Sequence, residues 1–223
     1  RYGTVTGVQT CALPISGEIY VGLLDKLISW AKKSDYSVEF EDNKFYGLPF
    51  EENEMISLEG VSDYMNRISK YKPRDYQVSA VYDALKYNRK LLISPTASGK
   101  SLMIYSIVRY FTEKEKNTLV VVPTTSLVEQ MYKDFEDYGW DVEKYCHKIY
   151  SGKEKNTNKN VVITTWQSIY NLNKSFFDNF DVVIGDEAHQ FKSKSLIGIM
   201  TKMDDAKYRF GFTGTLDGSQ THK

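Results

Sequence analysis

The stretch that decides the fold is Leu91-Leu92-Ile93, followed after one residue by Pro95-Thr96-Ala97-Ser98-Gly99-Lys100-Ser101. The apolar residues predict a buried strand, and the apolar run from Leu102 to Val108 predicts a helix. A loop that joins a strand to the start of a helix presents backbone N–H groups that can hold phosphate oxygens. The stretch therefore favours a phosphate-binding loop over an ordinary capped helix start.

Individual residues of this loop have distinct expected roles. Lys100 would reach the β- and γ-phosphates of a nucleotide, and the Ser101 hydroxyl would join the shell of a Mg²⁺ ion. Gly99 would let the backbone approach the phosphates, because it has no Cβ. The loop departs from the strict glycine-rich pattern at Ser94 and Ala97.

A second stretch, Asp186-Glu187-Ala188-His189, follows the apolar run Val182-Val183-Ile184. At the end of a buried strand, Asp186 would hold Mg²⁺ and Glu187 would orient and deprotonate an attacking water. The competing interpretation is a pair of acids that caps a strand at the surface. Taken with the phosphate loop, the pair predicts a site that splits a nucleoside triphosphate.

Strands and helices alternate from Pro73 onward, which predicts right-handed crossovers and a parallel sheet with helices on both faces. The runs Leu119–Val122 and Val161–Ile163 are apolar at every position, as a sheet covered on both faces requires. The predicted helices are 61–69, 75–87, 100–112, 126–137, 166–171 and 194–201; the predicted strands are 90–94, 118–122, 147–150, 160–164, 181–185 and 208–212.

The chain upstream of the alternation predicts a separate small unit. Apolar spacing indicates a helix over 19–33, and alternation indicates a strand over 36–40. Residues 41–60 are acidic and irregular, as in a linker. We expect residues 17–60 to form part of an α/β accessory, substrate-binding domain with its linker, and residues 61–223 to form the nucleotide-binding domain.

Both ends of the chain look cut. Residues 5–15 resemble the in-frame translation of a sequencing-adapter oligonucleotide, so we expect residues 1–16 to be an artefact and the natural N-terminus to be missing. A polar tail directly follows Thr213-Gly214-Thr215, a motif expected in mid-protein. The chain is interpreted as an internal fragment.

Six motifs in this order resemble the first RecA-like motor domain of superfamily 2 helicases, over residues 71–217. They are Tyr76-Gln77, Pro95–Ser101, Pro123-Thr124-Thr125 with Leu127 and Gln130, Thr164-Thr165-Trp166-Gln167-Ser168, Asp186–His189, and Thr213-Gly214-Thr215. Residues 22–42 resemble, more weakly, the end of the small N-terminal domain of a phage recombination helicase.

The resemblance implies roles for residues at these positions. Tyr76 and Gln77 would recognise adenine, or Gln77 would simply be exposed at a helix start. The nucleotide phosphates would lie against Thr96, Ala97, Ser98, Gly99, Lys100 and Ser101. Nucleic acid would contact Pro123, Thr124, Thr125, Thr165, Trp166 and Gln167, with Trp166 either stacked on a base or, as we expect, packed in the core. His189, Thr213, Gly214 and Thr215 would couple the nucleotide state to domain movement.

The implied cofactors are ATP and Mg²⁺, and the implied partner is DNA at a branch or a single-strand to double-strand junction, with RNA in R-loops as a further possibility. The implied function is an ATP-dependent DNA helicase or translocase of phage recombination and repair. Two alternatives remain: a motor subunit of a restriction system, and a nucleotide-dependent DNA-binding module that does not translocate.

The composition limits these readings. Lys plus Arg and Asp plus Glu both number 29, so the net charge gives no nucleic-acid signal, although a local basic stripe would suffice. No apolar run has the length of a membrane span, and a cytoplasmic setting, in the host if phage-encoded, is expected. The family completes its site with an arginine from a second motor domain. We therefore expect this chain alone to bind nucleotide weakly and to hydrolyse it very slowly.

Overall fold

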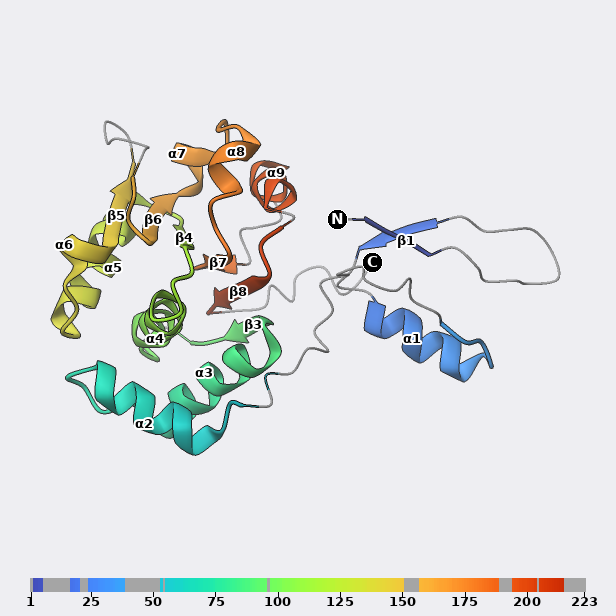
Figure 1. Cartoon of the computed structure of the whole chain (residues 1–223), viewed down its shortest axis with the longest axis horizontal. Helices are drawn as coiled ribbons and strands as arrows, with labels where there is room; N and C mark the ends of the chain where they lie inside the picture. The colour runs from blue at the N-terminus through green and yellow to red at the C-terminus, as the bar shows by residue number, and fades with distance from the viewer. Residues whose placement is uncertain are drawn as a thin grey trace. The chain divides into compact units, whose positions relative to one another are not determined.

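The structure is a computed structural model, and it describes residues 2–5, 17–20, 24–38, 53, 55–95, 97–150, 157–188, 194–203 and 205–214. The chain divides into two compact units, Arg1–Glu51 and Glu52–Lys223. Most helices and strands of each unit are labelled in Figure 1. Among the residues that are described, no helix combines the length and the apolar character needed to cross a membrane.

The smaller unit contains strands β1 (Tyr2–Val5) and β2 (Gly17–Tyr20), which pair antiparallel, and helix α1 (Leu24–Lys33). The helix expected over 19–33 therefore begins later, because residues 19 and 20 belong to β2. The strand expected over 36–40 is wrong at residues 36–38, which are irregular. The Tyr36 ring instead stacks on Trp30, with 5.6 Å between ring centroids and 19° between planes. Residues 39 and 40 lie outside the described ranges.

The larger unit is built on a six-stranded sheet in the order β3-β8-β7-β4-β6-β5, with every neighbouring pair parallel. The strands are β3 (Arg89–Ile93), β4 (Thr118–Val122), β5 (Cys146–Ile149), β6 (Val161–Thr165), β7 (Val182–Gly185) and β8 (Tyr208–Thr213). The parallel sheet predicted from the alternation is confirmed.

Helices cover both faces of this sheet (Figure 1). The helices are α2 (Leu58–Ile68), α3 (Asp75–Tyr87), α4 (Lys100–Thr112), α5 (Thr125–Asp137), α6 (Val142–Tyr145), α7 (Trp166–Ile169), α8 (Lys174–Phe177) and α9 (Lys194–Lys202). The larger core cluster includes residues of α2 to α6, and the smaller one includes residues of α7 to α9. The short helices α6 and α8 were not expected, since four residues are too few to show a helical period.

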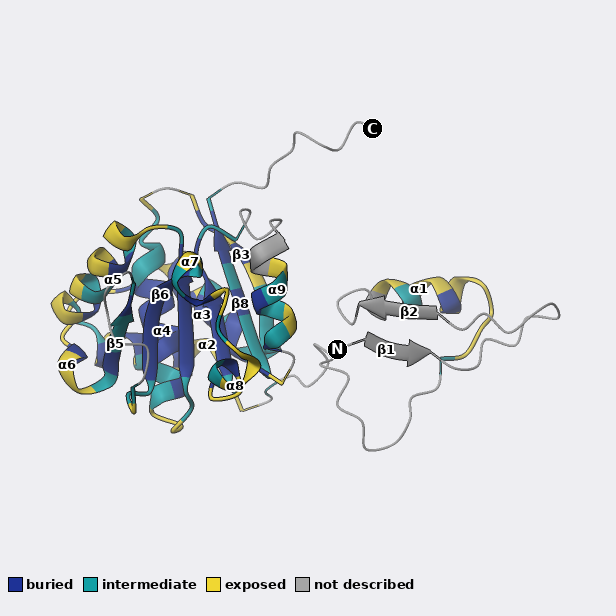
Figure 2. Ribbon diagram, turned by 90° about the horizontal axis from the view of Figure 1, so that it is seen from above, coloured by how far each residue is buried: buried dark blue, intermediate teal, exposed yellow. Residues whose placement is uncertain are grey.

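Successive residues of the central strands point to opposite core clusters, as strand geometry requires. Val120 and Val122 of β4 belong to the larger cluster, whereas Leu119 and Val121 belong to the smaller one. In Figure 2 the central strands are dark blue, meaning buried, and the outer sides of the helices are exposed. A sheet with two buried faces therefore explains the all-apolar runs of β4 and β6. The expectation of a buried strand at Leu91–Ile93 is wrong for Leu91 and Ile93, which are exposed, and holds for Leu92, because β3 is the outermost described strand on its side of the sheet.

Strand β8 lies between β3 and β7, so the two predicted motifs lie at the carboxyl ends of strands that are separated by a single strand. Ile93, before the loop, is opposite Thr213, and Gly185, before Asp186, is opposite Gly211. A Cβ at Gly211 would lie 2.9 Å from Leu91 Cδ1 and 3.1 Å from Ala188 Cβ, so a larger residue there would press on both neighbours. The carboxyl ends of parallel strands are where ligands bind in open α/β sheets.

Candidate nucleotide-binding site

Two residues of the loop before α4 have a positive φ. Gly99 is the N-cap of α4 with φ 75°, and Ala97 has φ 63°. A Cβ on Gly99 would lie 2.3 Å from Gln77 Nε2. Both the positive φ and the missing space explain why glycine is needed at position 99.

Two side chains of α3 hold this loop from the outside. Gln77 Nε2 donates to Ser98 O at 2.9 Å, and Tyr76 OH donates to the same oxygen at 2.8 Å. Gln77 Oε1 also accepts from Arg74 N at 2.9 Å, and the side chain is buried. Gln77 is thus not exposed at a helix start, while Tyr76 is 46% exposed. Adenine recognition by this pair stays a prediction.

The two acids follow β7 as predicted. Asp186 is buried, its N–H donates to Val121 O at 2.9 Å, and its Oδ1 accepts from Glu187 N at 2.9 Å. Glu187 has φ 52°, which turns the chain sharply at the end of the strand. The surface-cap interpretation does not fit a buried Asp186.

Lys100 joins the two motifs. Its Nζ lies 3.2 Å from Asp186 Oδ1 and also forms an ion pair with Glu187 Oε1. Burial lowers the pKa of the Lys100 ammonium group, but the contacts with Glu187 and Asp186 outweigh burial, and the pKa is raised. Lys100 is therefore held in its charged form, the form that binds phosphate.

A cavity of about 320 Å³ opens at this point. Its described lining residues are Ala97, Gly99, Lys100, Ser101, Leu127, Gln130, Met131, Asp134, Asp186 and Glu187. The volume lies at the small end of the range for ligand pockets. The Ser101 hydroxyl and the Asp186 carboxylate supply the hard oxygen ligands that Mg²⁺ prefers, so the lining fits a metal nucleotide.

The wall contributed by α5 contains residues that the motifs did not single out. Asp134 and Met131 line the cavity, and Tyr138, the C-cap of α5, meets Ser101 with 2.7 Å between hydroxyl oxygens. The pKa of the Asp134 carboxyl is raised, because the effect of burial outweighs the opposing effect of the Ser101 hydroxyl. The spacing of Leu127, Met131 and Asp134 along one helix face was the available signal.

The predicted nucleic-acid residues come from α5 and α7 and the strand ends before them. Thr124 caps α5 by accepting from Leu127 N at 3.3 Å, and Thr125 is exposed. Gln167 Nε2 donates to Pro123 O at 3.4 Å, which links the two motifs. Their contact with nucleic acid stays a prediction.

The remaining residues of this set are less accessible. Thr165 is buried and its Oγ1 lies 2.8 Å from Ser168 Oγ. Trp166 is half-buried and packs against the smaller core cluster, as the core alternative expects.

Residues expected to couple the site to movement are described only in part. Ser94 N donates to Thr213 O at 2.8 Å, so β8 ends against the start of the phosphate loop. Gly214 is half-buried. Thr96, His189 and Thr215 lie outside the described residues.

The sequence matches the family model described as "Type III restriction enzyme, res subunit" over residues 70–218. The chain belongs to this family. It has the fold of a superfamily 2 helicase motor domain, because the solved UvsW helicase of bacteriophage T4 aligns with a TM-score of 0.78 and 27% identity, over 89% of this chain and 72% of that one.

Two curated relatives support the assignment to helicase-type motor domains. The chain is 33% identical to the ATP-dependent DNA helicase uvsW of Enterobacteria phage T4 over 176 residues, 74% of this chain and 35% of that protein. It is 29% identical to the DNA 3'-5' translocase XPB2 of Sulfurisphaera tokodaii, over 80% of this chain and 35% of that protein. The chain thus spans about a third of the length of these relatives. A Sulfolobus solfataricus SWI2/SNF2 ATPase core shares the fold alone, with a TM-score of 0.59 and 16% identity over 67% of this chain and 33% of that one.

Proposed function

We propose that this chain is the ATP-binding half of a DNA helicase or translocase motor. The observation that carries the proposal is the meeting of Lys100 with Asp186 and Glu187 in one cavity that Ser101 also lines. The relatives named as a DNA helicase and a DNA translocase support DNA as the partner.

In this proposal, Lys100 and the loop backbone bind the triphosphate, and Ser101 with Asp186 would hold Mg²⁺. A bound Mg²⁺ neutralises charge that develops on the phosphate oxygens. Glu187 orients and deprotonates the attacking water. Because Lys100 is ion-paired with both acids, phosphate must draw it from Glu187, which frees that carboxylate to act as a base.

Hydrolysis by this chain alone should be slow. Among the described residues that line the cavity, Lys100 is the cation. The guanidinium of Arg209 donates to carbonyl oxygens of Ala206 and Met203, so it holds the chain just before β8 and does not line the cavity. An arginine supplied by another domain is worth orders of magnitude in the rate of phosphoryl transfer.

Branched DNA or R-loops in phage recombination and repair are the substrates we favour, because the chain is similar to the phage T4 helicase. The expected setting is the cytoplasm. A restriction motor is the second candidate, favoured by the description of the family model. Directional displacement of a strand by the whole protein, without endonuclease activity, would select the first candidate; ATP-sensitive binding without displacement would select a static binding module.

The direct test measures ATP binding by this chain with isothermal titration calorimetry. The wild-type chain should bind ATP with Mg²⁺ present, and Lys100→Ala should lose most of that affinity. Lys133→Ala, which removes an exposed lysine of α5, is the matched control and should bind like the wild type. Equal binding by Lys100→Ala would contradict the phosphate-loop assignment.

A further inference from the structure

Tyr138, the C-cap of α5, contacts the first turn of α4. Its hydroxyl lies 2.7 Å from Ser101 Oγ, the oxygen proposed to bind the metal. Asp134, one helical turn earlier on α5, lines the same cavity as Ser101. The Tyr138 hydroxyl of α5 therefore meets, at this cavity, the hydroxyl of α4 that would bind the metal.

A serine hydroxyl binds a metal ion through a lone pair of its oxygen. Ser101 Oγ has two lone pairs, so when the Tyr138 O–H donates to one of them, the other is left for the ion. The hydrogen bond with Tyr138 then fixes the direction of the remaining lone pair.

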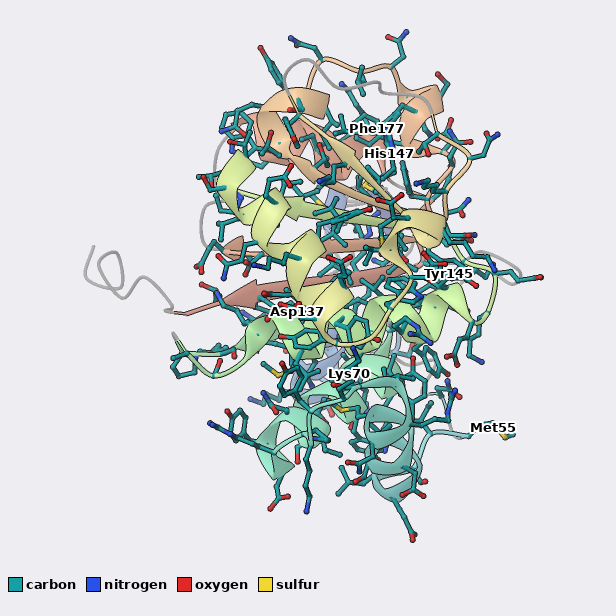
Figure 3. All side chains as sticks on the ribbon, turned by 90° about the vertical axis from the view of Figure 1, so that its left-hand side faces the viewer. Met55, Lys70, Asp137, Tyr145, His147 and Phe177 are labelled. Carbon is teal, nitrogen blue, oxygen red and sulfur yellow. The ribbon has the colours of Figure 1, made fainter. Side chains whose placement is uncertain are left out.

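Tyr138 is itself held by residues of the segment Ser69–Tyr71, which follows α2. Lys70 N donates to Tyr138 O at 3.2 Å, and the Tyr71 ring meets the Tyr138 ring edge to face at 5.8 Å. A Cβ on Gly139 would lie 3.1 Å from Lys70 Cε. Figure 3 shows Lys70 near Asp137, at the end of α5.

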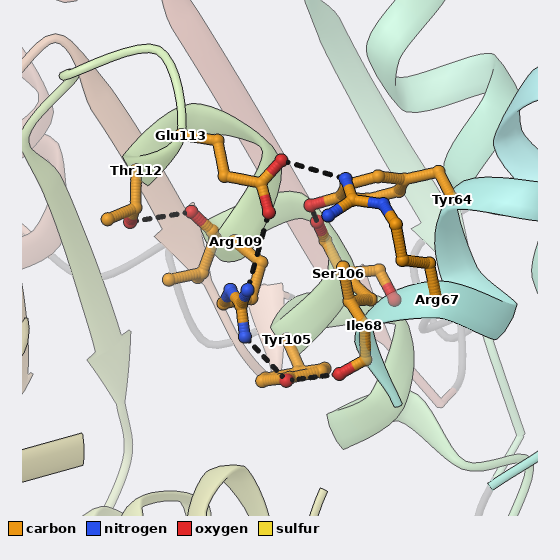
Figure 4. Close-up of polar contacts among 9 residues, drawn as sticks. Tyr64, Arg67, Ile68, Tyr105, Ser106, Arg109, Thr112 and Glu113 are labelled. Carbon is orange, nitrogen blue, oxygen red and sulfur yellow. Dashed lines mark hydrogen bonds and ion pairs between the residues drawn. The ribbon is translucent and has the colours of Figure 1, made fainter. Parts of the chain in front are cut away.

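A second tyrosine completes the attachment. The Tyr105 ring packs against Tyr138 with 5.1 Å between centroids, and its hydroxyl donates to Ile68 O at 2.7 Å. Figure 4 shows this bond beside the ion pairs of Glu113 with Arg67 and Arg109. These contacts fix the C-terminal end of α2 to α4.

We infer that Tyr138 is a positioning residue for the metal-binding hydroxyl of Ser101, and that it links this hydroxyl to the segment Ser69–Tyr71, which lies between α2 and α3. The inference rests on the proposed ATP site. It places the connection between α2 and α3 in direct contact with a residue that orients the metal end of the nucleotide pocket.

The test compares ATP affinity with excess Mg²⁺ against ATP affinity in EDTA, using the chain described here. The ratio of the two affinities reports the metal contribution. Tyr138→Phe keeps the ring contacts and removes only the hydroxyl. We expect the ratio to fall about two- to tenfold, the equivalent of one hydrogen bond, with the affinity in EDTA unchanged.

Tyr132→Phe is the matched control, because it removes another tyrosine hydroxyl of α5, one whose ring faces Lys148 Nζ at 4.2 Å rather than Ser101. Its ratio should equal that of the wild type. In a Ser101→Ala background, Tyr138→Phe should cause no further fall. Tyr138→Leu, which also removes the hydroxyl bonded to Ser101, should lower the ratio too and serves if Tyr138→Phe fails to fold.

An unchanged ratio in Tyr138→Phe, or an equal loss with Mg²⁺ and EDTA, would overturn the positioning role while leaving the ATP site intact. A wild-type chain that binds no ATP would overturn both proposals. The link between Tyr138 and the segment Ser69–Tyr71 is tested by Tyr71→Ala, which should lower the affinity ratio by a smaller factor. A wild-type ratio in Tyr71→Ala would show that this segment does not help to position Ser101.

Discussion

Lys100 and Asp186 lie on different crossover units of the sheet, yet Lys100 Nζ is 3.2 Å from Asp186 Oδ1. Asp186 is buried and the Lys100 side chain is 17% exposed, so water screens this pair only partly. The contact follows from strand order, since β8 lies between the strand before the loop and the strand before the acids.

Removing the cation should destabilise the fold as well as the nucleotide complex. Lys100→Ala leaves Asp186 and Glu187 without their shared partner, and we expect the free energy of unfolding to fall by about 1–3 kcal/mol. Urea unfolding followed by circular dichroism measures this. The double variant Lys100→Ala/Asp186→Asn should regain part of the loss; a larger loss would argue against charge repulsion as the cause.

Gly99 and Gly198 form a matched pair of glycine tests. Gly99→Ala should lower the free energy of unfolding by about 1–3 kcal/mol and weaken ATP binding, because φ is 75° and the new Cβ would meet Gln77. Gly198→Ala, inside α9 with no atom within 4 Å of the new Cβ, should instead stabilise by about 0.5–1 kcal/mol. Thermal and urea unfolding measure the change in the free energy of unfolding of both variants. A change of the same sign in Gly99→Ala and Gly198→Ala would refute the steric argument.

Asp134 predicts a stability change that depends on pH. Burial raises the pKa of this carboxyl in the folded chain, so ionisation is less favourable there than in the unfolded chain. Its stabilising contribution is complete below the ordinary aspartate pKa and is lost as pH rises through the raised value. Asp134→Asn should therefore raise the free energy of unfolding at neutral pH, and the gain should vanish in acid.

The measurement is urea unfolding of the wild type and Asp134→Asn at a series of pH values. Asp137→Asn, an exposed acid at the end of the same helix, is the control and should change the free energy of unfolding by no more than about 0.5 kcal/mol. A gain for Asp134→Asn that persists unchanged into acid would show that burial of the charge is not responsible.

Cys146 should be unreactive in the folded chain. The side chain is 1% exposed, and burial raises the pKa of its thiol to about 12. In a Cys11→Ser background, a thiol reagent such as DTNB should label Cys146 slowly in buffer and at once in denaturing urea. Fast labelling in buffer would mean that β5 opens readily from the edge of the sheet.

The sequence predicted the sheet well because its central strands are apolar on both faces, a pattern that few other structures produce. Helices 75–87 and 100–112 have the predicted bounds, since each begins at a clear motif and ends at a break in periodicity. The strand expected at 36–40 was wrong at its first three residues, because alternation in a short segment does not supply a pairing partner.

The candidate site was predictable where residues are close to a strand end and not where helices cross. Lys100, Asp186 and Glu187 follow strands whose ends meet, so their proximity follows from topology. Tyr138 reaches Ser101 only because the end of α5 packs across the start of α4. That crossing depends on side chains along both helices, and no motif reports it.

The position of β8 also bears on how the chain folds during synthesis. β3 lies at an edge of the described sheet, and its neighbour there, β8, pairs Arg89–Ile93 with Arg209–Thr213. A nascent chain that has not yet released Thr213 from the ribosome can form neither the β3–β8 nor the β7–β8 ladder. The phosphate loop then lacks the support that β8 gives it, so the nucleotide pocket is expected to be among the last parts to mature, after a stage in which apolar β3 needs protection from aggregation.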